Sequence, residues 1–375
     1  MFIILLIFSL QLYSQTWSVN KRLTWTSEIS SSPRIAAGSG ENLYLVWRDN
    51  LPGNAEIYFK RSTDGGVSWS VPKRLTWSSG LSYHPAIAAD SGGGVHIVWH
   101  DDNSGNREIY YRRSTDGGYS WSGLDRLTWN SGKSDNARIT ADSGSGIHIV
   151  WEDDSQGNSE IFYKRSTNSG LSWTAPKRIT WNPENSRYPS IAADSGSGIY
   201  IVWDDFSKGN YEIYFKKSTD GGSSWSAVKR LTWNSGGSYI PDIVISAGAG
   251  IHVTWFDNTS SNTEIYYKRS TDGGSIWTAL TRLTWDASAS DNPSITADSG
   301  SGIHIVWCDY NFGNWEVNHK MSTNSGSTWG GKNRLTWNSG NSSSPTIDAD
   351  SSGGIHVVWS DNTPGNIEIY YKNRK

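Results

Sequence analysis

Short acidic and amide side chains recur beside tryptophans throughout this sequence, at a constant interval of 52 residues. The acidic series lies in a Trp-x-Asp motif and consists of Asp49, Asp101, Asp153, Asp205, Asp257, Asp309 and Asp361. The amide series stands two residues before a glutamate and consists of Asn54, Asn106, Asn158, Asn210, Asn262, Asn314 and Asn366. The third series ends a Leu/Ile-Thr-Trp motif and consists of Trp25, Trp77, Trp129, Trp181, Trp233, Trp285 and Trp337. An indole beside fixed amide and carboxylate groups suits the recognition of a sugar ring, because the indole covers the C–H face and the polar groups bind hydroxyls.

The same residues also suit a structural role, in which Asp and Asn cap a hairpin while Trp packs between neighbouring units. Two interpretations therefore remain, seven similar ligand clefts or seven copies of one folding device. Between the fixed positions lies a variable series, whose diversity predicts an exposed surface: Arg48, His100, Glu152, Asp204, Phe256, Cys308 and Ser360. Tyr211 and Trp315 are additional aromatic candidates.

The elements that position these residues are predicted to be short strands. Three tryptophan series with the same period account for 21 of the 22 tryptophans. In residues 78–129 the pattern predicts strands at 85–89, 95–99, 108–112 and 126–129, separated by turns rich in Gly, Asn and Asp. No segment has a helical period.

Seven such units predict an all-β fold, a seven-bladed β-propeller of four-stranded antiparallel blades in one domain, residues 15–375. The expected blades are 26–77, 78–129, 130–181, 182–233, 234–285, 286–337, and 338–375 together with 17–25. Residues 17–25 match only the fourth strand of a unit, and the last unit lacks a fourth strand. We therefore expect the N-terminal strand to close the last blade, which removes an open sheet edge.

A second motif occupies the turn between the third and fourth strands, for example at residues 62–69, Ser-Thr-Asp-Gly-Gly-Val-Ser-Trp. It resembles the Asp-box, Ser-x-Asp-x-Gly-x-Thr/Ser-Trp, of the BNR repeat in sialidases and other secreted propellers. The resemblance spans essentially the whole chain after the first residues, and the central position is taken by Asp64, Asp116, Asn168, Asp220, Asp272 and Asn324. Asp and Asn both accept N–H bonds within their own turn, so these residues are expected to serve the fold. The resemblance also implies that ligands bind on the opposite face.

The sialidase resemblance implies three arginines that hold a substrate carboxylate, a Tyr–Glu nucleophile pair and an Asp acid/base. Most arginines here follow the repeat, and the sialidase Arg-Ile-Pro signature is absent, because Pro33-Arg34-Ile35 has another order. Arg34, Arg138 and Asp242 share one repeat position on the first strand, beside the expected channel. They suit either one polar site or a wet channel wall that tolerates charge. No catalytic residue is assigned.

Composition argues against several other classes of protein. The formal net charge is −3 and no basic run is present, so nucleic acid is not an expected partner. Cys308 is the only cysteine, which excludes an internal disulfide and a CxxC motif. No metal or other cofactor is expected, because the one calcium-like run, at 101–105, has Leu51 and Pro52 in its register in the first unit.

The first 14 residues form an apolar segment that ends in Leu-Tyr-Ser, typical of a signal peptide cleaved after Ser14. A buried strand and a membrane anchor are the other interpretations of this segment. No other apolar stretch approaches the roughly 20 residues that a membrane helix needs. We therefore expect a secreted or cell-surface protein, and the sequence does not indicate its oligomeric state.

These patterns favour a secreted, non-catalytic BNR/Asp-box propeller that binds several ligand molecules at once, with glycans as the expected partners. The alternatives are a sialidase-like glycoside hydrolase and a surface adhesion or protein-binding scaffold. Stoichiometry separates the first two, because an enzyme has one site whereas the repeated clefts number seven.

Overall fold

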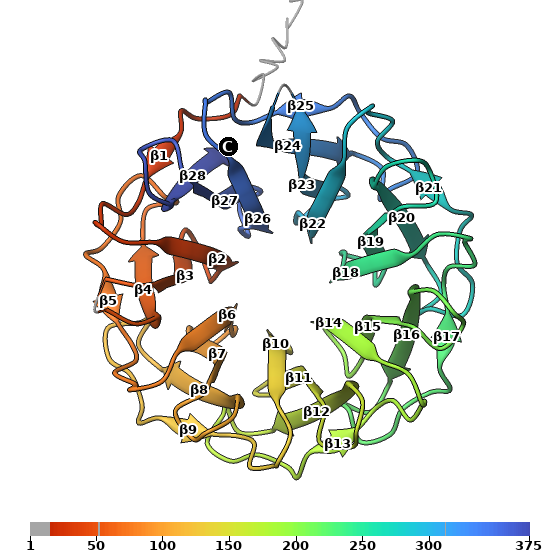
Figure 1. The fold of residues 1–375 in the computed structure, drawn as a ribbon, viewed down its shortest axis with the longest axis horizontal. Helices are drawn as coiled ribbons and strands as arrows, with labels where there is room; N and C mark the ends of the chain where they lie inside the picture. Colours follow the sequence, from red (N-terminus) through yellow and green to blue (C-terminus); the bar gives the residue numbers. More distant parts are fainter. Residues whose placement is uncertain (1–15, 52, 312) are drawn as a thin grey trace, which may run out of the picture.

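The computed structural model describes residues 16–51, 53–311 and 313–375, and every regular element within them is a β-strand. The strands form seven sheets of four antiparallel strands, arranged as blades around a centre (Figure 1). The prediction of a seven-bladed all-β propeller is confirmed. The predicted signal peptide, residues 1–14, lies outside the described residues.

Each blade runs from a strand beside the centre to a short strand at the periphery (Figure 1). The inner strands are β2 (Ser30–Ala37), β6 (Ser82–Ala89), β10 (Ser134–Ala141), β14 (Ser186–Ala193), β18 (Ser238–Ile245), β22 (Ser290–Ala297) and β26 (Ser342–Ala349). The second strands are β3 (Leu43–Asp49), β7 (Val95–Asp101), β11 (Ile147–Asp153), β15 (Ile199–Asp205), β19 (Ile251–Asp257), β23 (Ile303–Asn311) and β27 (Ile355–Asp361). The third strands are β4 (Glu56–Ser62), β8 (Glu108–Ser114), β12 (Glu160–Ser166), β16 (Glu212–Ser218), β20 (Glu264–Ser270), β24 (Asn314–Ser322) and β28 (Glu368–Arg374). The outer strands are β5 (Lys73–Arg74), β9 (Asp125–Arg126), β13 (Lys177–Arg178), β17 (Lys229–Arg230), β21 (Thr281–Arg282), β25 (Asn333–Arg334) and β1 (Lys21–Arg22).

The N-terminal strand completes the seventh blade, as the sequence predicts. β1 pairs antiparallel with β28, with Lys21 opposite Tyr371. The N–H of Ser18 donates to the carbonyl of Asn373 at 2.8 Å, which extends the pairing toward the N-terminus. Leu23 follows β1 and is buried in a cluster shared by the seventh and first blades. The ring is therefore closed by hydrogen bonds and by apolar packing.

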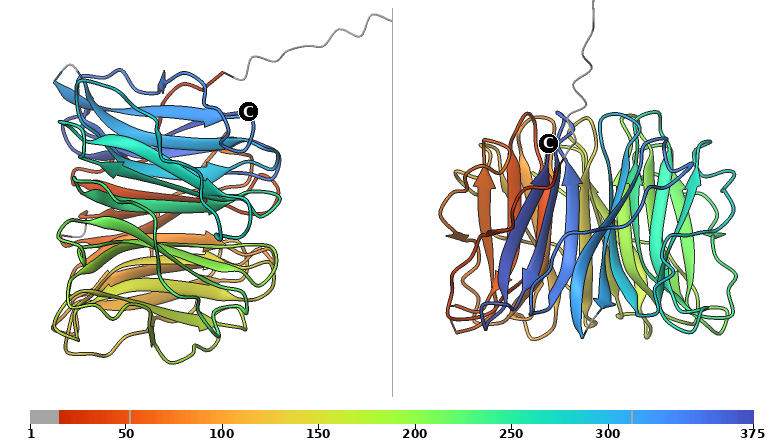
Figure 2. Two further views of the ribbon diagram at one scale, coloured as in Figure 1. Left: turned by 90° about the vertical axis from the view of Figure 1, so that its right-hand side faces the viewer. Right: turned by 90° about the horizontal axis from the view of Figure 1, so that it is seen from above.

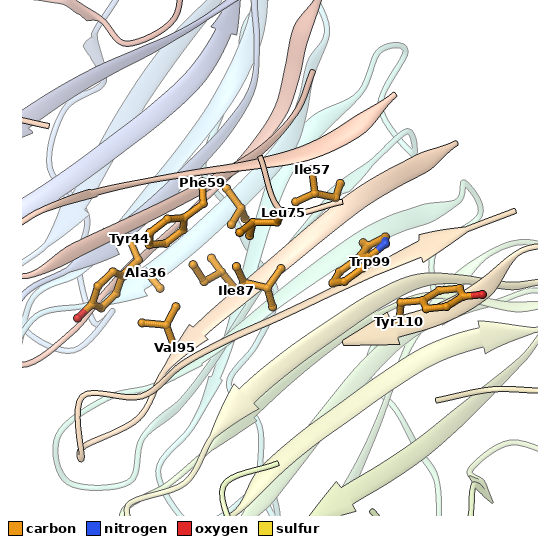
Figure 3. Packing of buried hydrophobic residues seen from close by; sticks show 11 residues of the cluster. Ala36, Tyr44, Ile57, Phe59, Leu75, Ile87, Val95, Trp99 and Tyr110 are labelled. Carbon is orange, nitrogen blue, oxygen red and sulfur yellow. The ribbon is translucent and has the colours of Figure 1, made fainter. Parts of the chain in front are cut away.

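The hydrophobic core lies between neighbouring blades. The second strands are almost wholly buried, because each is paired on both edges and covered on both faces. At the junction of the first two blades, Phe59 and Leu75 pack with Ile87 and Trp99 (Figure 3). Equivalent clusters occupy the other six junctions. The 52-residue repeat therefore encodes one apolar interface seven times.

The strand register assigns the connections to two faces of the ring, seen edge-on in Figure 2. Ser82 at the start of β6 faces Asp101 at the end of β7, which in turn faces Glu108 at the start of β8. The connections at this end, 102–107 and 127–133 in the second blade with their equivalents, define what we call the far face. Ser114, opposite Val95, leads into the Asp-box turn at the other end, the Asp-box face.

The outer strands are shorter than the sequence predicts, since β9 covers two residues rather than 126–129. Beyond these two residues, a threonine side chain takes the place of the backbone pairing between the outer and third strands. The first blade is an example. The N–H of Ile57 donates to Oγ1 of Thr76 at 2.9 Å, and that hydroxyl donates to the carboxylate of Glu56. The second carboxylate oxygen of Glu56 lies 2.8 Å from Nη2 of Arg74. The Glu of the Asn-x-Glu motif therefore fastens the outer strand to the third strand.

The Asp-box turns are held by their own side chains. In the second blade, Oδ1 of Asp116 accepts bonds from Oγ of Ser114 at 2.7 Å and from the N–H of Ser120 at 2.8 Å. Gly118 has a φ of +87°, a conformation that favours glycine. Hydrogen bonds, led by that from the Ser120 hydroxyl, lower the pKa of Asp116 to about 2. Asn168 forms the same turn in the next blade with its amide oxygen.

Candidate functional site

Each far-face aspartate is a buried junction of hydrogen bonds. In the third blade, the carboxylate of Asp153 accepts bonds from Oγ of Ser134 at 2.9 Å and Nε1 of Trp151 at 3.2 Å. It also accepts bonds from the side-chain amide of Asn130 at 2.6 Å and the N–H of Ser155 at 3.1 Å. The seven aspartates of this series are only 0–4% exposed. Their oxygens therefore face donors of the protein and set the shape of the far face.

The far-face asparagines connect one loop to the next. Nδ2 of Asn54 donates to the carbonyls of Ser78 at 2.9 Å and Gly80 at 2.7 Å. The same pair of bonds recurs in the other six blades. Each asparagine thereby joins the connection before the third strand to the connection that leads to the next blade.

The third predicted series lies on the surface. Its seven indoles, those of Trp25, Trp77, Trp129, Trp181, Trp233, Trp285 and Trp337, are 64–68% exposed. The tryptophans of the second strands are buried, and those of the Asp-boxes are half-buried. One repeat position therefore presents an indole to solvent in all seven blades, while the other two repeated tryptophans pack inside.

Each exposed indole lies at the junction between two blades. The guanidinium carbon of Arg126 lies 5.8 Å from the ring centre of Trp129, and Nζ of Lys164, from the next blade, lies 5.7 Å from it. At the first junction, a cavity of 230 Å³ is lined by Trp77 and by Asp101 of the following blade. At this junction the structure thus brings a member of the tryptophan series and a member of the aspartate series together.

The inner strands share an irregularity close to the far face. Their pairing with the second strands shifts register at one repeat position in every blade, a β-bulge. The residue at the bulge has a φ of +48° to +55° in each case: Ser32, His84, Asn136, Tyr188, Ile240, Asn292 and Ser344. A left-handed conformation costs residues with a Cβ about 1–3 kcal/mol, and a β-branched residue such as Ile240 tolerates it least.

The seven bulges encircle a cavity of 270 Å³ at the far-face mouth of the channel. Arg34, Arg138 and Asp242 line the same cavity, so the three residues that share a repeat position come together in space. Asp242 accepts a bond from Oγ of Ser190 at 2.8 Å and from the N–H of Ile295 at 3.0 Å. This carboxylate therefore joins three consecutive inner strands.

Burial and neighbouring charges shift the pKa values of the basic groups at the mouth. Desolvation and the neighbouring charge of Arg138 lower the pKa of Arg34 to about 9, and desolvation also lowers the pKa of Arg138. Desolvation, followed by the charges of both arginines, lowers the pKa of His84 to about 4. Arg34 and Arg138 therefore line the cavity together with the acidic side chain of Asp242, and the imidazole of His84 is uncharged at neutral pH.

Other residues that break the repeat gather beside this mouth, in the second and third blades. Nδ1 of His100 lies 3.1 Å from Oδ1 of Asp135, and Nη1 of Arg107 lies 2.8 Å from the other oxygen of that carboxylate. Oε1 of Glu152 accepts a bond from the amide of Asn136 at 2.8 Å. Burial raises the pKa of Glu152. The far face is therefore asymmetric in charge although the backbone repeats.

The prediction that the variable series from Arg48 to Ser360 is exposed is wrong. Glu152 is 8% exposed, Cys308 is 1% exposed and Asp204 has no exposed surface, while Arg48 and Phe256 are half-buried. The position is covered because it lies in the second strand, between two paired strands. Burial raises the pKa of Asp204 to about 8.

Three further properties of the described residues bear on function. None of these residues belongs to a helix long and apolar enough to cross a membrane. In the same ranges, His, Cys, Asp and Glu side chains do not gather in threes as metal ligands would. Cys308 is a free, buried thiol, and burial raises its pKa well above the usual value.

A family model described as a BNR repeat-like domain matches residues 14–253. The match covers more than half of the chain. This protein belongs to the BNR repeat-like family. No curated protein matches the BNR chain in sequence.

The BNR propeller is similar in fold to several solved structures. An ulvan lyase, a polysaccharide lyase, has a TM-score of 0.67 at 11% identity, over 94% of this chain and 95% of that one. A protein of unknown function from Dyadobacter fermentans has a TM-score of 0.60 at 13% identity, over 95% and 99% of the two chains. The intramolecular trans-sialidase from Ruminococcus gnavus has a TM-score of 0.53 at 12% identity, over 92% and 94%. At these identities the likeness shows the fold alone.

The bulge residues of the BNR repeats, including His84 and Tyr188, are not among the site residues predicted from the sequence. The predicted first strand of the second unit begins at residue 85 and leaves out the two preceding residues, Tyr83 and His84. A signal was present, because the residue before this pair is Ser in all seven repeats whereas the pair itself takes five different forms among the seven. A variable pair directly after a constant serine indicates positions whose side chains are not required by the repeated backbone fold.

Proposed function

We propose that this protein is a secreted, non-catalytic BNR propeller that binds carbohydrate at several equivalent places. The observation that carries the proposal is the series of seven indoles, each 64–68% exposed at one repeat position. Burial of apolar surface stabilises a fold by about 25 cal/mol per Å², and an exposed indole does not contribute this free energy. An indole at a fixed surface position offers the C–H face of a sugar a flat apolar platform.

In this proposal, the predicted site residues divide their roles. The indoles contact the sugar, while the cations beside them are held by the protein: near Trp129, Lys164 donates to the carbonyl of Leu127 and Arg126 donates to Glu108. The aspartates and asparagines hold the surrounding loops in place through the bonds described above. The seven clefts then act together on a dense glycan surface, where linked sites increase avidity.

The names of similar structures support carbohydrate as the ligand class. The ulvan lyase structure is described as bound to a -[GlcA(1-4)Rha3S]- saccharide, and the trans-sialidase structure as a complex with oseltamivir carboxylate. Export is proposed from the apolar segment at residues 1–14. The non-catalytic part of the proposal rests on the absence of the Arg-Ile-Pro signature and of an assigned nucleophile pair in the sequence.

The test compares the loss of one indole with the loss of all seven. A neutral glycan selected on a glycan array is titrated calorimetrically into each variant. Trp129→Ala should lower the stoichiometry by about one site in seven and leave the intrinsic affinity unchanged, whereas replacement of all seven tryptophans should abolish binding. Tyr119→Ala removes a ring that is 64% exposed on the Asp-box face and serves as the matched control.

Two outcomes would overturn the proposal. One is complete loss of binding in a folded Trp129→Ala protein, because that result requires a single site. The other is turnover of a fluorogenic sialoside that disappears in Arg34→Ala or Arg138→Ala, which would favour a glycoside hydrolase with its site at the channel mouth.

A further inference from the structure

One of the seven blade junctions differs from the others in the cation beside its indole. At six junctions a lysine from the third strand of the following blade places its Nζ 5.2–5.7 Å from the centre of the exposed indole ring. Each of these lysines also donates to a backbone carbonyl of the preceding blade. At the first junction the same repeat position is Arg112, the one member of the series that is not lysine.

The guanidinium of Arg112 does not cover the indole of Trp77 in the way that the lysines cover theirs. Its Nη1 keeps the repeated bond, to the carbonyl of Leu75 at 2.5 Å, but its Nε donates to the carbonyl of Ser122 at 2.9 Å. Among the described residues, only Arg74, from the preceding blade, places a cation over the Trp77 ring, at 5.6 Å from its centre. The cavity of 230 Å³ lies at this junction and is lined by both the indole and the guanidinium of the following blade.

Arg112 is a cation that the protein does not neutralise. The nearby Arg74 pairs with the carboxylate of Glu56 at 2.8 Å, whereas the bonds of Arg112 lead to carbonyl oxygens. Desolvation lowers the pKa of Arg112, and no carboxylate among the described residues counteracts this shift. A guanidinium carries more N–H groups than these two bonds use, so donors remain available at the cavity.

The other walls of the cavity also depart from the repeat. Leu124, which is 57% exposed, stands where the neighbouring blades have Pro72 and Pro176, so an apolar side chain joins Trp77 in lining the cavity. Nε1 of Trp99, another lining residue, has no hydrogen-bond partner among the described residues. The equivalent indole nitrogens of five other blades donate to the repeated aspartate. The first junction therefore combines an open indole, apolar surface and donors that the fold leaves unused.

We propose that the first blade junction, between Trp77 and Arg112, is a site for an acidic sugar, whose ring lies against the indole and whose carboxylate or sulfate accepts hydrogen bonds from the guanidinium. This inference rests on the proposed function, because it takes one of the seven indoles as a sugar platform, and it gives that junction a ligand class of its own. A planar guanidinium suits both anions, since it donates pairs of parallel hydrogen bonds. At the other six junctions the ammonium group contacts the indole and a carbonyl instead, so no preference for an acidic sugar is expected there.

Calorimetric titration with three tetrasaccharides of one linkage tests the site: cellotetraose, the tetraglucuronate of the same linkage, and cellotetraose 6-sulfate. We expect one molecule of an acidic probe per protein to bind at least about tenfold more tightly than cellotetraose, and the two acidic probes show whether carboxylate or sulfate is preferred. Arg112→Lys restores the residue of the other six blades, so it should fold normally but lose the tight site and its dependence on salt. Arg113→Lys is the matched control, because Arg113 donates to the carbonyl of Ser169 in the next Asp-box turn, and it should change little.

A second variant should gain a site, which misfolding does not cause. The double variant Lys164→Arg, Pro176→Leu reproduces the arginine and the leucine in the third blade and should raise the number of tightly bound acidic molecules from one to two. Acidic probes that bind no more tightly than cellotetraose, an unchanged tight site in Arg112→Lys, or no second site in the double variant would each overturn the inference.

The neutral glycan used to test the proposed function separates the two failures. Arg112→Lys keeps all seven exposed indoles, so this glycan should bind the variant with the stoichiometry and affinity that it shows for the wild type. Loss of neutral binding at the indoles of the wild type would contradict the proposed function. Neutral binding at all seven indoles without an acidic preference at the first junction would contradict this inference alone.

Discussion

At the scale of single residues, hydrogen-bond donors and burial decide the pKa of an aspartate. The pKa of Asp116 falls to about 2, because neighbouring hydroxyl and N–H groups donate to its exposed carboxylate. The pKa of Asp204 rises to about 8, because burial outweighs its bond from the N–H of Ile240. The bonds of Asp116 could be predicted from the Ser-x-Asp motif. The burial of Asp204 could not, because its position holds a different side chain in every repeat and so has no pattern to interpret.

Asp204→Asn should stabilise the protein increasingly as the pH rises. Below pH 3.8 the carboxyl is protonated in both the folded and the unfolded chain and costs nothing. Between pH 3.8 and about 8 the unfolded chain loses this proton while the folded chain keeps it, so Asp204 lowers the free energy of unfolding by up to about 1.4 kcal/mol per pH unit. Melting temperatures of the two proteins from pH 4 to 8.5 measure the difference. A gap that does not vary with pH would contradict a raised pKa.

At the scale of the strand, the repeat predicts the order and number of strands well because turn residues and alternating apolar positions recur in phase. It does not predict the bulge of the inner strands. Residues with positive φ are expected to be glycine, yet seven non-glycine residues of the inner strands take this conformation, Ile240 among them. The bulge recurs at one repeat position in all seven blades, although the side chains there differ. The arginine pair could be placed on one repeat position, but the bulge residues that line the same cavity were not predicted.

The threonine that replaces part of the outer strand offers a test at this scale. Thr76→Val keeps the shape of the side chain but removes the acceptor of the Ile57 N–H and the donor to Glu56. Because these groups are buried, we expect the free energy of unfolding to fall by about 2–3 kcal/mol in urea titrations. Thr76→Ser retains the hydroxyl and should lose less than half as much. Equal losses in the two variants would assign the effect to the methyl group instead.

At the scale of the whole ring, stability depends on closure. A protein that begins at Thr26 lacks β1 and the buried Leu23, so the edge of β28 and one face of the core are exposed to water. We expect a loss of the order of 5 kcal/mol or aggregation, seen as a lower melting temperature and as larger species in light scattering. A protein that begins at Thr16 is the control. If both proteins melt at the same temperature, β1 does not contribute to closure.

The pairing of β1 with β28 also sets the order of events during synthesis. Lys21 leaves the ribosome early, but its partner Tyr371 is translated only after the other blades. Until then β1 has no partner strand and the ends of the growing arc expose apolar blade faces, a state in which β proteins are prone to misassembly. Because each blade curves the arc further, the two ends approach one another as translation proceeds. Closure therefore joins two ends that the folded blades have already brought close together. It does not require an unfolded chain to find a contact that is distant in sequence.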